Sequence, residues 1–169
     1  MKYPEEIIFS KFHVFVTDHR CNGVSSTCTI DEFFDTEKVN ALRKEVACCE
    51  GLSVVYGVGA SYVCEGDVLV YFDIEMEEIK SRYRAGLDNW GAKNYDEEFL
   101  RKEKRFMFME ARVQDKHKRS LLDTFNYYVD ANIANMPKMI SKEVYETIMD
   151  QFVSQPFQCV PFFAPGVWG

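Results

Sequence analysis

The chain has 169 residues and a net charge of −7, and 47% of its residues are hydrophobic, including 14 Phe and 9 Tyr. This is ample for the core of one domain, and the acidic balance argues against a nucleic-acid partner, because phosphate backbones are bound by basic surfaces. No apolar run reaches the roughly 18 residues of a membrane span and no secretion signal opens the chain, so we expect a cytoplasmic protein whose six cysteines are reduced thiols.

The N-terminal third predicts one strand and one helix. Residues 12–16 alternate between two faces in the manner of a strand. Residues 37–49 then carry apolar side chains at spacings of three and four, which predicts a helix capped by Thr36 and stopped by Gly51.

Two short apolar runs follow, at residues 52–56 and 68–72, and both are rich in β-branched side chains. Such runs are typical of strands in a parallel sheet that is covered on both faces. Between them lie Gly57, Gly59 and Ser61, in a loop of small residues where the backbone can turn sharply and approach a neighbouring group closely.

A polar helix begins at about residue 75, directly after the second run ends in Asp73. A carboxylate in this position is a candidate general base or Mg²⁺ ligand, and it is equally suited to capping the helix. Arg82 and Arg84 lie in the last turns of the helix and are candidates for binding a phosphate. Because residues two apart diverge by about 200° around a helix, one of them could instead pair with Glu78 or Asp88.

The remaining elements are less sharply marked. Trp90 lies among turn residues, where it either covers a ligand or packs on the sheet edge. The hydrophobic patterns predict, in order, a helix at 97–104, a strand at 106–112, a basic helix at 115–122, a strand at 125–129 and a helix at 141–153 that Ser141 caps.

Strands that alternate with helices predict an α/β fold with a mostly parallel sheet and helices on both faces. In such sheets, ligands bind beyond the carboxyl ends of the strands. The sequence therefore places a site at the Gly57–Ser61 loop, at Asp73 and at residues 130–132.

Several motifs in a fixed order resemble a known family. The order of GVGASYV, DVLVYFDIEMEEIKSRYR, DKHKR, FNYYVDAN and VPFFAPGVWG is similar to the kinase-like front region of bacterial class I mannose-6-phosphate isomerase-like proteins, a degenerate relative of the P-loop uridine-type kinases. The resemblance implies a P-loop-kinase-like fold in which Arg82 and Arg84 reach phosphates. The chain departs from the kinases in lacking the Walker A lysine. In that family the cupin domain that holds the metal, such as zinc, and performs the isomerisation lies downstream.

The chain's own ionisable residues offer little catalytic chemistry. Its three histidines show no metal-ligand spacing, so no metal or other cofactor is expected within it. Two basic runs, at 101–105 and 116–119, are candidates for gathering phosphate groups, although most charge runs are solvated helix faces.

Two hypotheses about function follow. The preferred one is a non-catalytic accessory domain at residues 1–153, which belongs to a sugar-phosphate isomerase and binds a phosphorylated small molecule. Its alternative is a nucleoside or sugar kinase, or a nucleotide-binding module, that uses a non-standard phosphate loop. Residues 154–169 are interpreted as an arm that leads to a missing downstream domain. Its apolar side chains either favour self-association of this chain or fold back over the sheet of its own domain.

Overall fold

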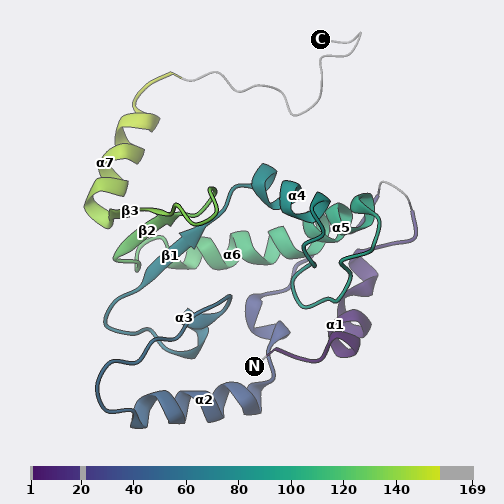
Figure 1. The fold of residues 1–169 in the computed structure, drawn as a ribbon, viewed down its shortest axis with the longest axis horizontal. Helices are drawn as coiled ribbons and strands as arrows, with labels where there is room; N and C mark the ends of the chain where they lie inside the picture. Colours follow the sequence, from purple (N-terminus) through teal and green to yellow (C-terminus); the bar gives the residue numbers. More distant parts are fainter. Residues whose placement is uncertain (1, 20–21, 157–169) are drawn as a thin grey trace.

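The computed structural model describes residues 2–19 and 22–156. Within these ranges, helices predominate over three short strands (Figure 1). The elements are, in chain order, α1 Glu5–Phe12, η1 His13–Phe15, η2 Ile30–Phe33, α2 Thr36–Cys48, α3 Ala60–Val63, β1 Val70–Asp73, α4 Met76–Arg84, α5 Phe99–Arg105, η3 Phe106–Glu110, α6 Ala111–Leu121, β2 Tyr127–Asp130, β3 Lys138–Ser141 and α7 Lys142–Val153.

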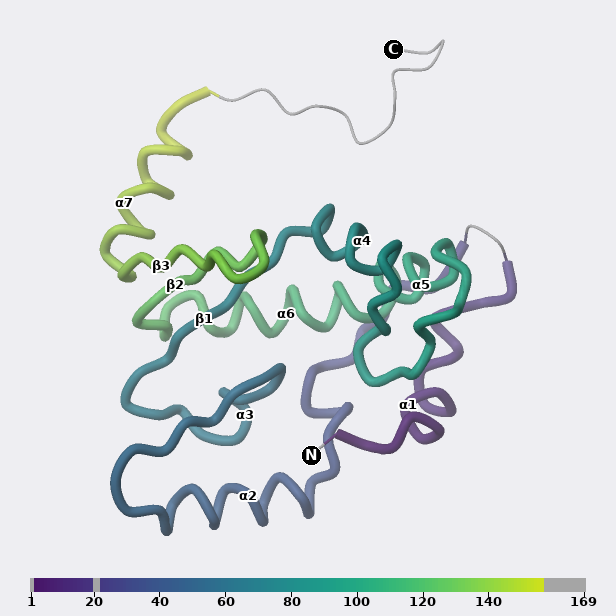
Figure 2. Tube along the Cα trace, viewed as in Figure 1, coloured from purple at the N-terminus to yellow at the C-terminus, as the bar shows by residue number. Residues whose placement is uncertain are grey.

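The three strands form one mixed sheet in the order β1-β2-β3. β1 and β2 are parallel, with Asp73 opposite Asp130, whereas β3 returns antiparallel to β2. The chain passes from β1 to β2 through α4, α5, η3 and α6, and α6 carries it back beside the sheet to the start of β2 (Figure 2). This crossover brings the carboxyl ends of β1 and β2 to the same edge.

The N-terminal half packs around aromatic rings. Phe12 of α1 stacks on Phe33 of η2, with ring centroids 4.0 Å apart, and Val39 of α2 and Val113 of α6 complete the same buried cluster. Buried residues of this cluster come from α1, η2, α2, η3 and α6, so η3 and α6 are fixed from this side by the N-terminal elements.

A buried polar network holds the helices from α4 to α6. Glu110 is fully buried, and its carboxylate accepts hydrogen bonds from the Tyr83 hydroxyl (2.9 Å), the Asn89 amide (3.2 Å) and the Arg105 guanidinium (2.9 Å). The Lys102 ammonium is likewise buried and donates to the carbonyls of Leu87 and Tyr95. Each buried charge therefore has the polar partners that burial demands.

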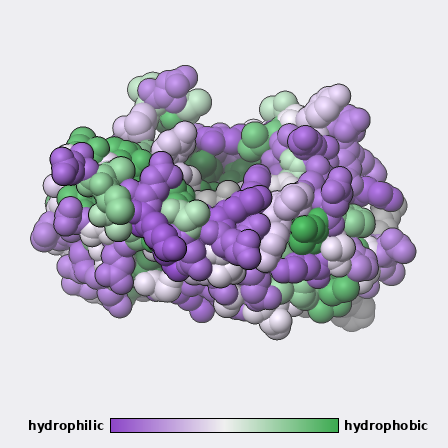
Figure 3. All heavy atoms as spheres, turned by 90° about the horizontal axis from the view of Figure 1, so that it is seen from below, coloured by the Kyte–Doolittle hydropathy of each residue, from purple (hydrophilic) through white to green (hydrophobic). Residues whose placement is uncertain are grey.

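The face on which α2 lies is largely hydrophilic, with hydrophobic atoms in separate patches (Figure 3). Among the described residues, no helix combines the length and the apolar character that a bilayer crossing requires.

The five predicted helices are confirmed, and those predicted at 97–104 and 115–122 correspond to α5 and to the later turns of α6. The helix predicted from residue 37 is α2, although Asp35 rather than Thr36 caps it, accepting hydrogen bonds from two backbone amides of the first turn. The helix after Asp73 is α4 and the last one is α7, which Ser141 caps as predicted.

The predicted α/β fold with a mostly parallel sheet between helices is wrong. Only one pair of strands is parallel, and β3, which the sequence did not suggest, forms a hairpin with β2. The predicted strand at 52–56 has no strand partner among the described residues, and Leu52 and Tyr56 are 94% and 89% exposed. A β-branched run becomes a strand only when another strand pairs with it and its side chains are covered. The P-loop-kinase-like architecture is therefore not the one that this chain adopts.

Two further strand predictions are wrong. Residues 12–16 end α1 and form η1, because Ile8 and Phe12, four apart, bury one helical face. Residues 106–112 continue α5 through the π-helical η3 into α6, and buried Phe106, Met109 and Val113 follow the helical spacing of three and four rather than the alternation of a strand. Most of the predicted arm, residues 157–169, lies outside the described residues.

Candidate functional site

The side chains of Ser61 on α3 and His117 on α6 are in contact. The Ser61 Oγ lies 3.0 Å from the His117 Nε2, although 56 residues separate them in sequence. The imidazole is half-buried, and this burial lowers the pKa of His117 below its usual value, so the ring is neutral at pH 7. A neutral Nε2 can accept the serine proton, which leaves Nδ1 as a donor.

The backbone before Ser61 is shaped by glycine. Gly59 has a φ of +85°, and a Cβ added there would lie 2.4 Å from the Phe34 ring, so no other residue fits without a shift. The Arg43 guanidinium fixes the far end of α3, donating to the carbonyls of Tyr62 (2.6 Å) and Val63 (3.3 Å). The glycine loop therefore approaches a neighbouring group closely, as predicted, and that group is the Phe34 ring. The contact at Gly59 and the bonds from Arg43 lie on either side of Ser61 and fix its position.

Asp73 contacts a neighbouring side of α6, at the residue after His117. Its Oδ2 accepts a hydrogen bond from the Tyr128 hydroxyl at 2.6 Å and forms an ion pair with the Lys118 ammonium. Burial and the bond to Asp73 raise the pKa of Tyr128 above its ordinary value, so this tyrosine remains a donor at neutral pH. We call Ser61, Asp73, His117, Lys118 and Tyr128 the α6 junction.

The helix in the middle of this junction is strongly basic. α6 carries four lysine and arginine side chains and one aspartate, a net charge of +3 in a chain whose net charge is −7. Lys116 donates to the backbone carbonyls of Thr27 and Cys28, so its charge is not cancelled by a carboxylate there. The basic run at 116–119 is therefore a local positive region in an acidic protein.

The two arginines predicted to bind phosphate diverge. The Arg82 guanidinium donates to Glu78 (2.7 Å) and to the carbonyl of Ala131 (3.0 Å), which places it at the carboxyl end of β2. The Arg84 guanidinium lies 4.3 Å from the centroid of the Phe99 ring on α5. Of the two arginines, Arg82 lies at the strand ends and Arg84 does not. Arg82 pairs with Glu78, as the sequence suggested for one of them.

Trp90 and Gly57 are the last two of the predicted site residues. Trp90 packs against the rings of Phe33 and Phe34, with centroids 4.7 and 6.0 Å apart. Gly57 has a φ of +106°, and a Cβ added there would meet no atom within 4 Å, so this glycine turns the chain without a close contact. The structure thus brings Ser61 and Asp73 to α6, and places Trp90 in the N-terminal aromatic cluster.

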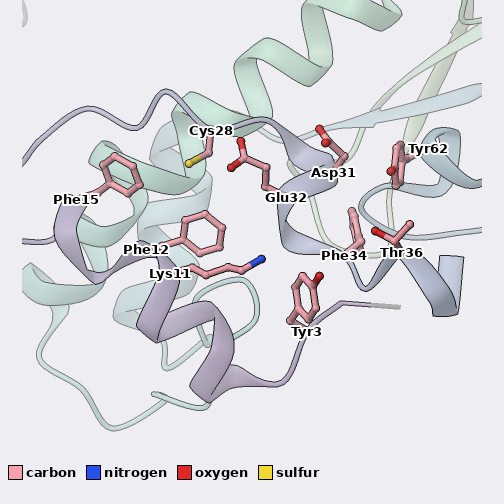
Figure 4. A pocket seen from close by; sticks show the side chains of 10 residues that line it. All are labelled: Tyr3, Lys11, Phe12, Phe15, Cys28, Asp31, Glu32, Phe34, Thr36 and Tyr62. Carbon is pink, nitrogen blue, oxygen red and sulfur yellow. The ribbon is translucent and has the colours of Figure 1, made fainter.

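A separate cavity of about 410 Å³ lies between α1, η2 and α3. Its walls are aromatic, and Figure 4 shows the rings around the open space with the Lys11 side chain reaching into it. We call it the aromatic pocket; its five rings belong to Tyr3, Phe12, Phe15, Phe34 and Tyr62.

Three charged side chains also line the aromatic pocket. The Lys11 ammonium lies 4.3 Å from the centroid of the Tyr3 ring, and among the described residues no carboxylate forms an ion pair with it. Glu32 is engaged in a capping box, accepting from the Thr29 amide at 2.8 Å, whereas the carboxylate of Asp31 points away from Lys11 (Figure 4).

Sequence reasoning missed both the partners of the predicted residues and the whole aromatic pocket. His117 and Lys118 were seen as part of a basic run, but nothing local says that they face Ser61 and Asp73. For the pocket, the only available signal was the density of aromatic residues in the first 34 positions. Within the described ranges, no three His, Cys, Asp or Glu side chains gather as metal ligands.

The α6 junction has the groups that anion binding requires. The Lys118 ammonium has three donors, of which Asp73 takes one, and its side chain is 33% exposed. When the Ser61 hydroxyl donates to Nε2, the Nδ1–H of His117 adds a neutral donor on the adjacent side of the helix. Such a combination of lysine and imidazole donors is suited to phosphate oxygens.

Comparison with known proteins gives a family but no function. A family model described as a domain of unknown function (DUF8485) matches residues 1–154. No curated protein and no solved structure matches the chain.

Proposed function

This chain belongs to the family of a domain of unknown function (DUF8485), and we propose that it binds a phosphorylated small molecule at the α6 junction. The observation that carries the proposal is the contact between Ser61 Oγ and His117 Nε2 at 3.0 Å. It joins two segments that the sequence had marked separately as phosphate-binding candidates, the glycine loop and the basic run at 116–119.

Asp73 supports the same location. It was predicted as a site residue at the end of a strand, and its ion pair with Lys118 brings it to the residue next to His117. Consecutive residues point about 100° apart around a helix, so His117 and Lys118 serve neighbouring sides of α6. A ligand that contacts both must curve around the helix, which suits a phosphorylated sugar better than inorganic phosphate.

The biological role that fits such binding is that of an accessory domain to a sugar-phosphate enzyme. The resemblance of its motif order to mannose-6-phosphate isomerase-like proteins, which the sequence suggested, favours a hexose phosphate as the ligand. A kinase is the alternative, and its test is turnover of ATP that Asp73→Ala abolishes.

A thermal-shift titration tests the proposal, using inorganic phosphate, mannose 6-phosphate, glucose 6-phosphate and ATP as probes. A ligand present at 100 times its Kd stabilises a fold by about 2.7 kcal/mol. We expect a hexose phosphate to raise the melting temperature more than inorganic phosphate does, and Lys118→Met and His117→Gln each to reduce the shift.

Lys44→Met is the matched control, because Lys44 is exposed on α2, away from the α6 junction. It should leave the shift unchanged. Equal shifts in Lys118→Met, His117→Gln and the unsubstituted protein would remove the junction as the site, and no shift with any probe would contradict the binding itself.

A further inference from the structure

We propose that residues 52–56 of two copies of this chain pair as antiparallel β-strands and so form a dimer with two-fold symmetry. This goes beyond the proposed function, because it concerns another surface and a protein partner. It is carried by a short segment that has the composition and the boundaries of a strand but no strand beside it among the described residues.

The segment is exposed and unpaired. It leads from the end of α2 to α3 (Figure 2), and Leu52, Val54 and Tyr56 are 94%, 73% and 89% exposed. Within the described ranges, no hydrogen bond involves the backbone or the side chains of residues 52–56. The backbone N–H and C=O groups of this segment are therefore available to another strand.

A glycine bounds the segment at each end. Gly51 has a φ of +89° and Gly57 has a φ of +106°, whereas strands need negative φ values, so pairing can extend only over the residues between them. Residues 52–56 contain no helix, turn or bend. Their sequence, LSVVY, is rich in the β-branched and aromatic side chains that favour strands, and its length is typical of one.

The segment also lacks the features that keep exposed strands apart. Natural proteins protect an unpaired strand edge with charged side chains, proline or a β-bulge. Residues 52–56 contain no charged residue and no proline. An unprotected, apolar and unpaired strand is a template for pairing with another chain.

The spacing of the apolar side chains makes a second copy the fitting partner. If the pairing is centred on Val54, this residue lies opposite Val54 of the second copy, and Leu52 lies opposite Tyr56. Residues that face each other in an antiparallel pair point to the same side, so the exposed apolar side chains of both copies form one continuous face. A shift by one residue would place them on opposite faces.

The charge next to the segment favours the antiparallel direction. Glu50 directly precedes Gly51. Parallel pairing in register would place the two Glu50 side chains beside each other, which is unfavourable, whereas antiparallel pairing places them at opposite ends. A two-fold antiparallel pair also uses the same surface on both copies and closes the assembly at a dimer.

The dimer should be weak and reversible. A pair of five-residue strands buries less surface than a standard interface, and each copy carries a net charge of −7. We therefore expect a dissociation constant between about 1 μM and about 1 mM. Part of the charge repulsion is screened at an ionic strength of about 0.15 M.

Sedimentation velocity of the full chain tests the proposal, at protein concentrations that span this range. We expect a monomer that converts to a dimer as the concentration rises. Val54→Asp places two carboxylates opposite each other at the symmetry axis, and it should raise the dissociation constant by at least about tenfold. Because residues 52–56 make no hydrogen bond within the described part of the chain, the melting temperature of the monomer should not change.

Val24→Asp is the matched control, since it makes the same exchange at a position that is 54% exposed and outside the segment. It should leave the dissociation constant unchanged. A chain that stays monomeric up to about 1 mM, species larger than a dimer, or a dimer that Val54→Asp does not weaken would overturn the proposal.

Isotope-filtered NMR spectra of a mixture of ¹³C-labelled and unlabelled copies test the register without any substitution. We expect nuclear Overhauser effects between the Leu52 methyl groups of one copy and the Tyr56 ring of the other. Effects between Leu52 and Leu52 of the two copies would indicate parallel pairing. Effects from residues 52–56 to residues 157–169 would identify that segment as the partner instead, and either result would contradict the antiparallel pair.

Discussion

The helices from α4 to α6 and the sheet with α7 differ in what they bury. Between α4 and α6, charged and polar side chains such as Glu110, Lys102 and Asn89 are buried and fully hydrogen-bonded. In the sheet and α7, apolar side chains such as Phe72 and Phe152 are 63% and 55% exposed, and no residue of α7 is buried. The first region is specified by directional bonds, whereas the second is held mainly by strand pairing and a few aromatic contacts.

From this difference we expect the buried polar network between α4 and α6 to contribute more to stability than the exposed apolar side chains of the sheet and α7. Removing a buried charge leaves its partners without compensation in a low-dielectric interior. Removing an exposed apolar group costs little. α6 belongs to both regions, since its N-terminal end joins the network and its later turns carry His117 and Lys118, so the network supports the proposed site.

The largest effect is expected from Glu110→Ala. It removes a carboxylate that accepts from Tyr83, Asn89 and Arg105 and leaves the largely buried guanidinium without its carboxylate partner, which should lower the free energy of unfolding by about 3 to 5 kcal/mol. Urea denaturation would measure this. Glu146→Ala removes an exposed pair with Lys142 on α7 and should cost less than about 1 kcal/mol. An equal decrease in the free energy of unfolding of both variants would contradict the difference between the two regions.

A smaller effect is expected from Tyr128→Phe, which removes one polar contact of the sheet. The hydroxyl donates to Asp73 at 2.6 Å in a partly buried setting, and such a bond contributes about 1 kcal/mol. The same denaturation experiment applies, with Tyr127→Phe, an exposed neighbour on β2, as the control. A loss as large as that of Glu110→Ala would show that the sheet also depends on buried polar bonds.

A pH dependence is expected from His117. Because the pKa of its folded form is lowered by burial, the unfolded chain binds more protons between that pKa and about 6.5. The free energy of unfolding should therefore fall as the pH decreases from about 6.5 to the lowered pKa of folded His117. Above about 6.5, the contribution of His117 to stability should not change with pH. Denaturation at several pH values would show the slope, and His117→Gln should flatten it, whereas His13→Gln at an exposed position should not.

The smallest effect is expected from Ile148→Ser on α7. Ile148 is 49% exposed, and surface substitutions of this kind usually change the free energy of unfolding by no more than about 0.5 kcal/mol. A loss well above 1 kcal/mol would mean that this face of α7 is covered in solution. A loss that grows with protein concentration would identify the cover as a second copy of the chain, as the sequence led us to expect for residues 154–169.

Local signals were enough to predict the helices with clear ends. Residues 37–49 and 141–153 have apolar spacings of three and four, and a side-chain cap lies beside each start. The strand at 52–56 was mispredicted because a strand depends on a distant partner, which a local pattern does not contain. At 106–112, side chains alternate over a few residues and also fit a helix, and burial of Met109 and Val113 decides for the helix.

The candidate site was predictable in its individual residues but not in their assembly. Ser61 and Asp73 could be predicted as site residues because ligands commonly bind at glycine loops and at strand ends. Their partners, His117 and Lys118, lie on a helix that is reached only through the crossover from β1 to β2. The aromatic pocket was not predictable at all, because Lys11 and Asp31 become neighbours of the same space only after α1 packs on η2.

The central claim, binding of a phosphorylated small molecule at the α6 junction, is tested most directly by amide correlation NMR spectra of the assigned protein during titration with mannose 6-phosphate. We predict saturable shifts of the Ser61, Asp73, His117 and Lys118 amides, weaker in Lys118→Met and unchanged in Lys44→Met. Saturable shifts confined to other residues, or no shifts at all with mannose 6-phosphate, glucose 6-phosphate or ATP, would contradict the account.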